Sequence, residues 1–369
     1  MYISIVTITE MPVGSYTGRL IPLCRCTLWH RGFFVIQINR GGYLLTDRPY
    51  KDYDKLLDKL KCRGLEIDND EYAIEMLKAR SYYGLINAFK NEVTYRDVSG
   101  KERFNEGVTF RGIVTEYWIE NELKSLLLKY SLLAEIRLKE AVSHQLAKSF
   151  GENLETYLDR SHFNNRTGRR NSILGNIKRT ARNTHDNPTY YYRNSHDTIP
   201  PWILLPNLTF GQFKKLYNIL KSEQKSKVVK SILYIPDDRD VDQISESFVG
   251  DGISVLVDFR NTLAHGSRLL QYKSGTTIAF NTIKQIFGTN FLSEEEYQND
   301  EIGGNDLFCL IYTIFKFCGN IDSEMFKIEI ENLFNSFSNT PGIKDQFKIY
   351  YHAAGLPQNL SEKFKLLQK

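Results

Sequence analysis

The stretch DGISVLVDFRNTLAHGSRLLQY, residues Asp251 to Tyr272, decides the fold of this 369-residue chain. Its apolar side chains recur three and four positions apart, as on one face of an α-helix: Ile253, Leu256, Val257, Leu263 and Ala264. Gly266 directly follows His265, and a glycine in that position is typical of a helix C-terminus. The stretch therefore predicts an amphipathic helix in a mainly α-helical protein, with His265 in its last turn.

This helix contains an arginine and a histidine separated by four residues, in the sequence RNTLAH from Arg260 to His265. The looser pattern, an arginine followed after four to six residues by a histidine, also occurs at Arg25/His30, Arg137/His144 and Arg179/His185. The spacing alone therefore does not distinguish a catalytic pair from the other three. Only Arg260 and His265 combine an apolar helix, an immediate helix stop and an asparagine after the arginine, so Arg260, Asn261 and His265 are the candidate catalytic residues.

The geometry of a helix restricts how these side chains can act together. Residues five apart point roughly 140° from each other on a straight helix. Arg260 and His265 therefore meet on one phosphate only if the last turn loosens, or if a two-fold dimer brings a second copy of the helix opposite the first. The helix dipole favours a protonated imidazole at a C-terminus, which suits a general acid, and an arginine suits a phosphate. The structural alternative is that Arg260 caps the helix and His265 covers an apolar edge.

Composition limits the class of protein. The chain has 48 Lys and Arg against 44 Asp and Glu, so an RNA site would have to come from local clustering of charge. Five cysteines, an odd number, predict a reducing cytoplasm and no disulfide scaffold. No apolar run is long enough to cross a bilayer, so we expect no membrane association. Cys24, Cys26 and His30 could ligate a metal, but they lack a fourth ligand nearby, and we predict neither a metal site nor a cofactor.

Four regions follow from changes in composition. Residues 1–46 are rich in Thr, Ile and Gly, with β-like runs at Tyr2–Thr9 and Phe33–Ile38. They form either a small strand-forming extension or a poorly ordered one, or they reflect a start codon chosen too early. We expect a helical N-terminal segment over 47–100, a helical core over 101–280 with a basic insertion at 160–200, and a helical C-terminal segment over 281–369.

Periodicity and capping signals predict the helices within these regions. The core should contain a long helical pair, Gly107–Tyr130 and Ser131–Phe150. Asp68 and Glu71 resemble a capping box for a helix at Tyr72–Arg80, and Thr209 and Gln212 one for Phe213–Leu220. The remaining expectations are a helix at Tyr53–Cys62, a lysine-rich turn at Lys221–Lys230, and helices at Asp306–Phe317 and Glu324–Phe337.

Two charged residues, Glu135 and Arg137, lie within the leucine-rich second helix of the predicted pair. Charges so close to an apolar stripe are usually a solvated edge or an ion pair. The alternative is that they support the cleft that uses His265.

Residues 160–193 carry many basic side chains, with Asp186 as the only acidic residue after Asp159. The candidate RNA-binding residues there are Arg166, Arg169, Arg170, Lys178, Arg179, Arg182, Tyr190 and Tyr191. Basic side chains beside aromatic rings suit single-stranded RNA, because the charges bind phosphates and the rings stack on bases. A solvated or disordered loop is the alternative.

Several blocks of the sequence, in order, resemble the Abi-like proteins, the AbiD/AbiF group of bacterial abortive-infection systems. The blocks are RGLEIDND (63–70), LKARSYYGLINAF (77–89), FGENLETYLD (150–159), PPWILLPNLTFGQFKKLY (200–217), RNTLAHGSRL (260–269) and GLPQNLSEKF (355–364). The resemblance runs from Arg48 to about Phe364. Ordered blocks of this kind are far more specific than any single motif.

The resemblance implies a helical bundle of the HEPN type and a ribonuclease that acts as a toxin or phage-defence effector. HEPN nucleases work without metal: the RNA 2′-hydroxyl attacks its own phosphate and leaves a cyclic phosphate and a 5′-hydroxyl. Carried over by position, His265 becomes the general acid or base, Arg260 the phosphate-binding group and Asn261 the residue that orients them. Arg268 matches the family's trailing arginine and is added to the RNA-binding candidates.

The expected partners follow from the same resemblance. They are RNA as substrate, a second copy of the chain, and a cognate structured regulatory RNA, because some family members are encoded beside such RNAs; DNA is not expected. The alternative function is that of a non-catalytic RNA-binding or RNA-sensing protein in a phage-defence or toxin–antitoxin system.

Overall fold

The structure of the protein is a computed structural model that describes residues 37–38, 44–45, 50–265 and 268–367. The chain divides into two units, Met1–Asp52 and Tyr53–Lys369. In the first unit, β1 (Gln37–Ile38) pairs antiparallel with β2 (Leu44–Leu45), and β1 is the end of the predicted run Phe33–Ile38. The run Tyr2–Thr9 and the three possible metal ligands, Cys24, Cys26 and His30, lie outside the described residues.

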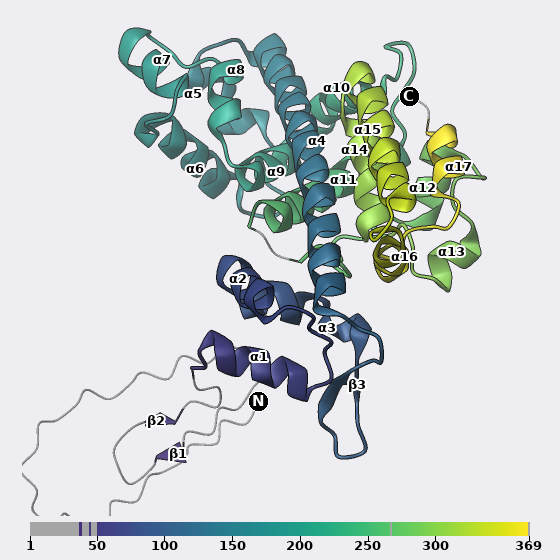
Figure 1. The fold of residues 1–369 in the computed structure, drawn as a ribbon. Coiled ribbons are helices and arrows are strands. Elements are labelled where there is room, and N and C mark those ends of the chain that lie inside the picture. Colours follow the sequence, from purple (N-terminus) through teal and green to yellow (C-terminus); the bar gives the residue numbers. More distant parts are fainter. Residues whose placement is uncertain (1–36, 39–43, 46–49, 266–267, 368–369) are drawn as a thin grey trace, which may run out of the picture. The chain divides into compact units, whose positions relative to one another are not determined.

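The second unit is mainly α-helical, as predicted (Figure 1). Its first part contains α1 (Tyr53–Cys62), α2 (Asp70–Arg80), the π-helical turn η1 (Tyr83–Asn87), α3 (Ala88–Val93), β3 (Thr94–Arg96), β4 (Glu102–Phe104) and α4 (Phe110–Phe150). Next come α5 (Leu154–Tyr157), η2 (Arg160–His162), α6 (Arg170–Asn183), α7 (Thr189–Ser195), α8 (Pro201–Leu204), η3 (Leu205–Asn207), α9 (Phe210–Ile219), α10 (Ser222–Leu233) and α11 (Gln243–Ala264). The C-terminal part contains α12 (Phe280–Phe287), α13 (Glu294–Gln298), α14 (Leu307–Phe317), α15 (Asn320–Asn339), α16 (Lys344–Ala353) and α17 (Leu360–Leu366).

Helix α4 is the central element of this unit, and it corrects one prediction. The expected helical pair, Gly107–Tyr130 and Ser131–Phe150, is a single helix of 41 residues, about 60 Å long. It contains no proline, and its one glycine, Gly112, lies in the first turn, so nothing in the sequence ends it before Gly151. Its buried side chains contact α8, α10, α11, α14, α15 and α16, which surround it in Figure 1.

Helix α11 packs against α4, α9, α10, α12 and α14, and its bounds differ from the prediction. It begins two turns earlier than Asp251, because the Asp242 side chain accepts the Ser245 N–H at 2.6 Å and caps it. It ends at Ala264, one residue before the predicted end at His265. Gly252 allows the close approach to α14: a Cβ there would lie 2.6 Å from Phe317 Cζ.

Three further predictions need correction. Asn69, and not Asp68, caps α2, by accepting the Tyr72 N–H, while Asp68 pairs with Arg111. The expected lysine-rich turn at Lys221–Lys230 is helix α10, whose residues Val228, Val229 and Ile232 are buried. The basic region 160–193 contains helices α6 and α7, because buried Leu174, Ile177 and Ala181 give α6 an apolar face.

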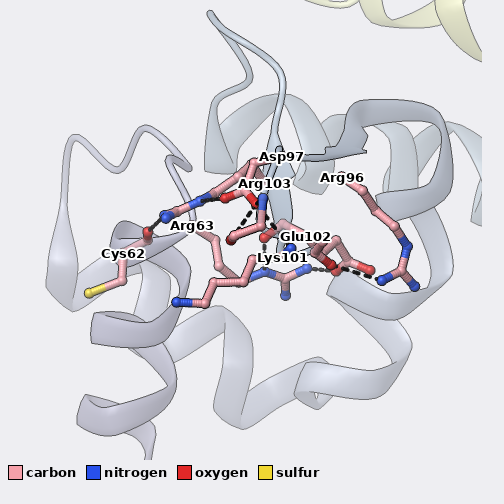
Figure 2. Close-up of polar contacts among 9 residues, drawn as sticks. Cys62, Arg63, Arg96, Asp97, Lys101, Glu102 and Arg103 are labelled. Atoms are coloured by element: carbon pink, nitrogen blue, oxygen red, sulfur yellow. Dashed lines mark hydrogen bonds and ion pairs between the residues drawn. The ribbon is translucent and has the colours of Figure 1, made fainter.

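A β-hairpin, β3 and β4, lies between α3 and α4. Figure 2 shows its charged side chains in contact with the end of α1. Glu102 pairs with Arg63 and Lys90, and Arg103 pairs with Asp97 and donates to the Cys62 carbonyl. The contact with Cys62 holds the hairpin against the end of α1 (Figure 2). The contact with Lys90 holds it against α3.

Candidate functional site

The three candidate catalytic residues lie at the C-terminal end of α11. Arg260 and Asn261 belong to its last turn and a half, and His265 is the residue that ends it. The Arg260 side chain is 31% exposed, and Asn261 and His265 are exposed. The His265 backbone N–H donates to Asn261 O at 3.0 Å. Within the described part of the chain, the side chains of these three residues make no hydrogen bond.

Helix α11 ends at the histidine. His265 has φ −93° and ψ 10°, so its backbone has left the helical values that continue to Ala264. The sequence predicted either a loosened last turn or a second copy of the helix. Because the His265 N–H keeps its helical hydrogen bond to Asn261 O, the turn is regular up to His265, and both alternatives stay predictions.

A buried carboxylate, Glu135 of α4, lies behind Arg260. Its Oε2 is 3.4 Å from Arg260 Nε, and its Oε1 is 2.7 Å from Lys139 Nζ, one turn later on α4. The Glu135 side chain is only 7% exposed. Among the residues that the structure describes, neither Arg260 Nε nor Glu135 Oε2 has a hydrogen-bond partner, so their contact is an ion pair without hydrogen-bond geometry. Glu135 therefore attracts the Nε edge of the Arg260 guanidinium electrostatically. The two terminal nitrogens of the guanidinium make no hydrogen bond to the described residues.

Lys139 is a second cationic partner of Glu135. Its ammonium group also donates to the carbonyls of Leu208, at 2.7 Å, and Pro206, at 3.2 Å. A buried carboxylate is costly unless it is paired, and Lys139 supplies the second positive charge. The sequence analysis named Glu135 but missed Lys139, although a glutamate and a lysine four apart on one helix face are a recognisable signal.

Arg137 does not belong to this site. Its guanidinium donates to the Ser231 and Ile232 carbonyls of α10 and to the Lys316, Phe317 and Cys318 carbonyls around the end of α14. It lies over the Tyr234 ring, 4.6 Å from the centroid. Arg137 therefore closes two helix C-termini, where carbonyls lack partners within the helix. Of the two charged residues predicted on this helix, only Glu135 contacts Arg260.

Fewer basic side chains of region 160–193 are available to bind RNA than the sequence suggested. Glu155, which precedes the region, pairs with Lys178 and lies 3.6 Å from Arg182. Arg170 is half-buried and donates to the Phe163 carbonyl. Glu155, which belongs to α5, therefore compensates part of the positive charge of α6.

Five candidates of the basic region remain exposed without an acidic partner among the described residues: Arg166, Arg169, Arg179, Tyr190 and Tyr191. Arg193 lies over the Tyr190 ring at 5.2 Å and donates to the carbonyls of Ala181 and Thr184, so it links α7 to the end of α6. Helix α6 packs on α9, and α9 packs on α11.

Arg268 is an internal residue of the fold and not part of the exposed basic surface. Its Nη2 lies 2.7 Å from Glu92 Oε1, and its guanidinium lies over the Phe89 ring. The Arg268 side chain is mostly buried. Arg268 therefore joins the chain beyond His265 to α3.

The part of the chain that the structure describes contains neither a metal-binding cluster nor a helix able to cross a membrane. Among the described residues, no group of three or more His, Cys, Asp or Glu side chains is arranged to hold a metal ion. Within the same residues, no helix is both long enough and apolar enough to cross a membrane.

Comparison with known proteins identifies the family. The profile of the family described as Abi-like protein matches residues 75–271, which is more than half of the chain and includes α4, the basic helices and α11. No curated protein and no solved structure matches the chain significantly. On the strength of the family match, the chain belongs to the Abi-like family of abortive-infection proteins.

Proposed function

We propose that this protein is a metal-independent endoribonuclease of the HEPN type that acts as an abortive-infection effector. The observation that carries the proposal is the setting of Arg260. A buried Glu135–Lys139 pair contacts one edge of its guanidinium, and its other nitrogens make no hydrogen bond to the described residues. Asn261 and His265, on the same helix end, are exposed. An arginine held in this way is suited to binding a phosphate or the charge that develops on it.

In the proposed reaction, the 2′-oxygen of the RNA attacks the adjacent phosphorus, and the bond from phosphorus to the 5′-oxygen of the next nucleotide breaks. The 2′-hydroxyl proton passes to a base, and the leaving 5′-oxygen takes up a proton from an acid. His265 acts in this proton transfer, because an imidazole changes its charge near neutral pH. Arg260 stabilises the phosphorane charge. The products are a 2′,3′-cyclic phosphate and a 5′-hydroxyl.

We further propose that two chains assemble so that their α11 termini face each other. An exposed apolar stripe lies on α4 and its neighbour α15: Leu132, Ile136, Ile321, Met325 and Ile328. Ile136 is 64% and Ile321 is 81% exposed, which is unusual for isoleucine. Leu132 lies one helical turn before Glu135, on the side of α4 that adjoins the Arg260 site. A second copy seated on this stripe would bring two Arg260 groups into one cleft.

The surface formed by α6 and α7 would bind the RNA strand. Arg166, Arg169 and Arg179 are available for phosphates, and Tyr190 and Tyr191 for bases. The same surface favours the second candidate function, a non-catalytic RNA-binding or RNA-sensing protein. A cognate structured RNA is a candidate regulator under either function.

The test compares wild type with Arg260→Ala, His265→Ala and His144→Ala on labelled single-stranded RNA. His144 is an exposed histidine from another arginine–histidine pair of similar spacing, so it is the matched control. Cleavage by wild type and by His144→Ala, with loss in the other two, supports the proposal. RNA binding without cleavage by any of the four, even with added cellular RNA as activator, contradicts it and favours the binding protein.

A further inference from the structure

The chain that follows the catalytic candidates is held by α4. After the helix ends, the backbone passes through Arg268, Leu269 and Leu270, and Leu269 and Leu270 are buried. The Leu269 N–H donates to Glu120 Oε1 and the Leu270 N–H to Glu120 Oε2, both at 3.1 Å. One carboxylate therefore binds two successive backbone amides outside any helix or sheet.

Glu120 is suited to this contact because it is buried and charge-balanced. It is 2% exposed, and Lys124, one turn later on α4, places its Nζ 2.5 Å from Oε1. Hydrogen bonds to an ionised carboxylate are stronger than those between neutral groups. A second contact adds to the first: Arg268, next to Leu269, is bound to Glu92 of α3.

These contacts restrict His265 from its C-terminal side. The helix holds the His265 backbone from one side through the bond to Asn261 O, and the next held residue, Arg268, follows only three positions later. Fixing residues near a group in the chain reduces the positions that the group can take up, and releasing them restores conformational freedom. The exposed imidazole has no side-chain partner of its own among the described residues, so the position of its Cα depends on the contacts of the backbone on either side.

We propose that Glu120 is a positioning residue for His265: by binding the amides of Leu269 and Leu270, it sets the place of the imidazole at the phosphate. This inference rests on the ribonuclease function proposed above. Glu120 does not touch the RNA, because it is buried on the inner side of α4. It acts through the backbone, and its loss should slow the chemical step and leave RNA binding intact.

The test uses the full-length protein with Glu120→Gln and, as matched control, Glu122→Gln, an exposed glutamate of the same helix. A glutamine at position 120 can accept one amide through its oxygen, but its NH2 group cannot accept the other. We expect kcat for single-stranded RNA to fall about tenfold or more, since a small misplacement of a catalytic group has an effect of this size. KM should stay within about twofold of wild type, because the binding surface on α6 and α7 is untouched.

Hydrogen exchange supplies a readout that does not depend on activity. The amides of Leu269 and Leu270 should exchange faster in Glu120→Gln, while the amides of buried α11 residues such as Val255 keep their protection. Glu120→Asp, which keeps the charge on a shorter side chain, should recover part of the lost kcat. If Glu120→Gln destabilises the fold, the kinetics are measured at a temperature where the variant is fully folded.

The outcomes separate this inference from the proposed function. If wild type cleaves, His265→Ala does not, and Glu120→Gln cleaves at the wild-type kcat, the positioning role is overturned and the ribonuclease stands. Loss of kcat without faster exchange at Leu269 and Leu270 also overturns it. If wild type does not cleave RNA, the ribonuclease proposal fails, and the role of Glu120 in catalysis fails with it.

Discussion

Glu135 Oε2 lies 3.4 Å from Arg260 Nε, and this contact joins the middle of the long helix α4 to the end of α11. Glu135 is buried and Arg260 reaches solvent, so the pair connects the core to the surface where the candidate site lies. We expect this contact to orient the Arg260 guanidinium toward a phosphate.

Replacing Glu135 by glutamine tests that role. The change leaves Lys139 and Arg260 without their carboxylate, and breaking a buried pair on one side typically costs about 3 kcal/mol. We expect a lower urea midpoint and, in the fraction that remains folded, a loss of RNA cleavage close to that of Arg260→Ala. Glu140→Gln, an exposed position on α4, is the control and should change neither quantity. RNA cleavage by Glu135→Gln at the wild-type rate would show that Glu135 has no role in the site.

Arg137 should behave differently from Glu135, although only two positions separate them. Arg137→Ala removes the donor that satisfies carbonyls at the ends of α10 and α14. We expect the free energy of unfolding to fall by about 3 kcal/mol, because charged hydrogen bonds are lost and buried carbonyls are left unpaired. Cleavage per folded molecule should stay unchanged, and Arg179→Ala should leave the unfolding midpoint where it is. A specific loss of kcat in Arg137→Ala would show that this residue acts on the site.

The pH dependence of stability should report on Glu116. Burial, together with the nearby charges of Glu92 and Glu120, raises the pKa of Glu116 from 4.5 to about 7, although Arg268 opposes the shift. The folded state therefore holds this proton more tightly than the unfolded state. The resulting stability is complete below about pH 4.5 and is lost as the pH rises through about 7.

Glu116→Gln removes this dependence, because an amide resembles the protonated acid. At pH 8 the variant should gain stability relative to wild type, up to about 3 kcal/mol, and at pH 4 it should gain nothing. Urea unfolding at the two pH values measures the difference, with Glu122→Gln as the control. An equal effect of Glu116→Gln at both pH values would contradict the assignment.

RNA binding by the surface of α6 and α7 should depend on salt concentration. The triple variant Arg166→Ala, Arg169→Ala and Arg179→Ala should bind single-stranded RNA more weakly. Its affinity should also depend less on salt, with the slope of log K against log salt smaller by up to about 2, since each phosphate contact on a single strand contributes about 0.7. Lys178→Ala is the matched control, because Lys178 already pairs with Glu155. An unchanged slope in the triple variant would place the RNA elsewhere.

The helical fold could be predicted from the sequence, because its signals are local. The caps at Thr209 and Asp306 and the apolar period of α11 depend on residues a few positions apart. The continuity of α4 was harder to predict, since a helix boundary was placed at Tyr130–Ser131 without a glycine or proline to cause it. Both residues are buried against neighbouring elements.

The candidate site could be predicted only in part. The RNTLAH sequence located Arg260 and His265, because both lie on one helix. Glu135 of α4 was predicted as a possible support for the site. Its contact with Arg260, and the contact of Glu120 with Leu269, could not be predicted, because more than 100 positions separate the two residues of each contact. The pairing of Lys178 with Glu155 was missed for the same reason, because only the packing of α5 near α6 brings the two charges together.

The most direct test of the central claim is the chemistry of the RNA ends. Wild type and His265→Ala are incubated with single-stranded RNA in EDTA, and the termini of any fragments are analysed. The proposed mechanism predicts fragments from wild type alone, ending in a 2′,3′-cyclic phosphate and beginning with a 5′-hydroxyl. Fragments with 5′-phosphate ends, fragments that disappear in EDTA, or equal cleavage by His265→Ala would contradict it.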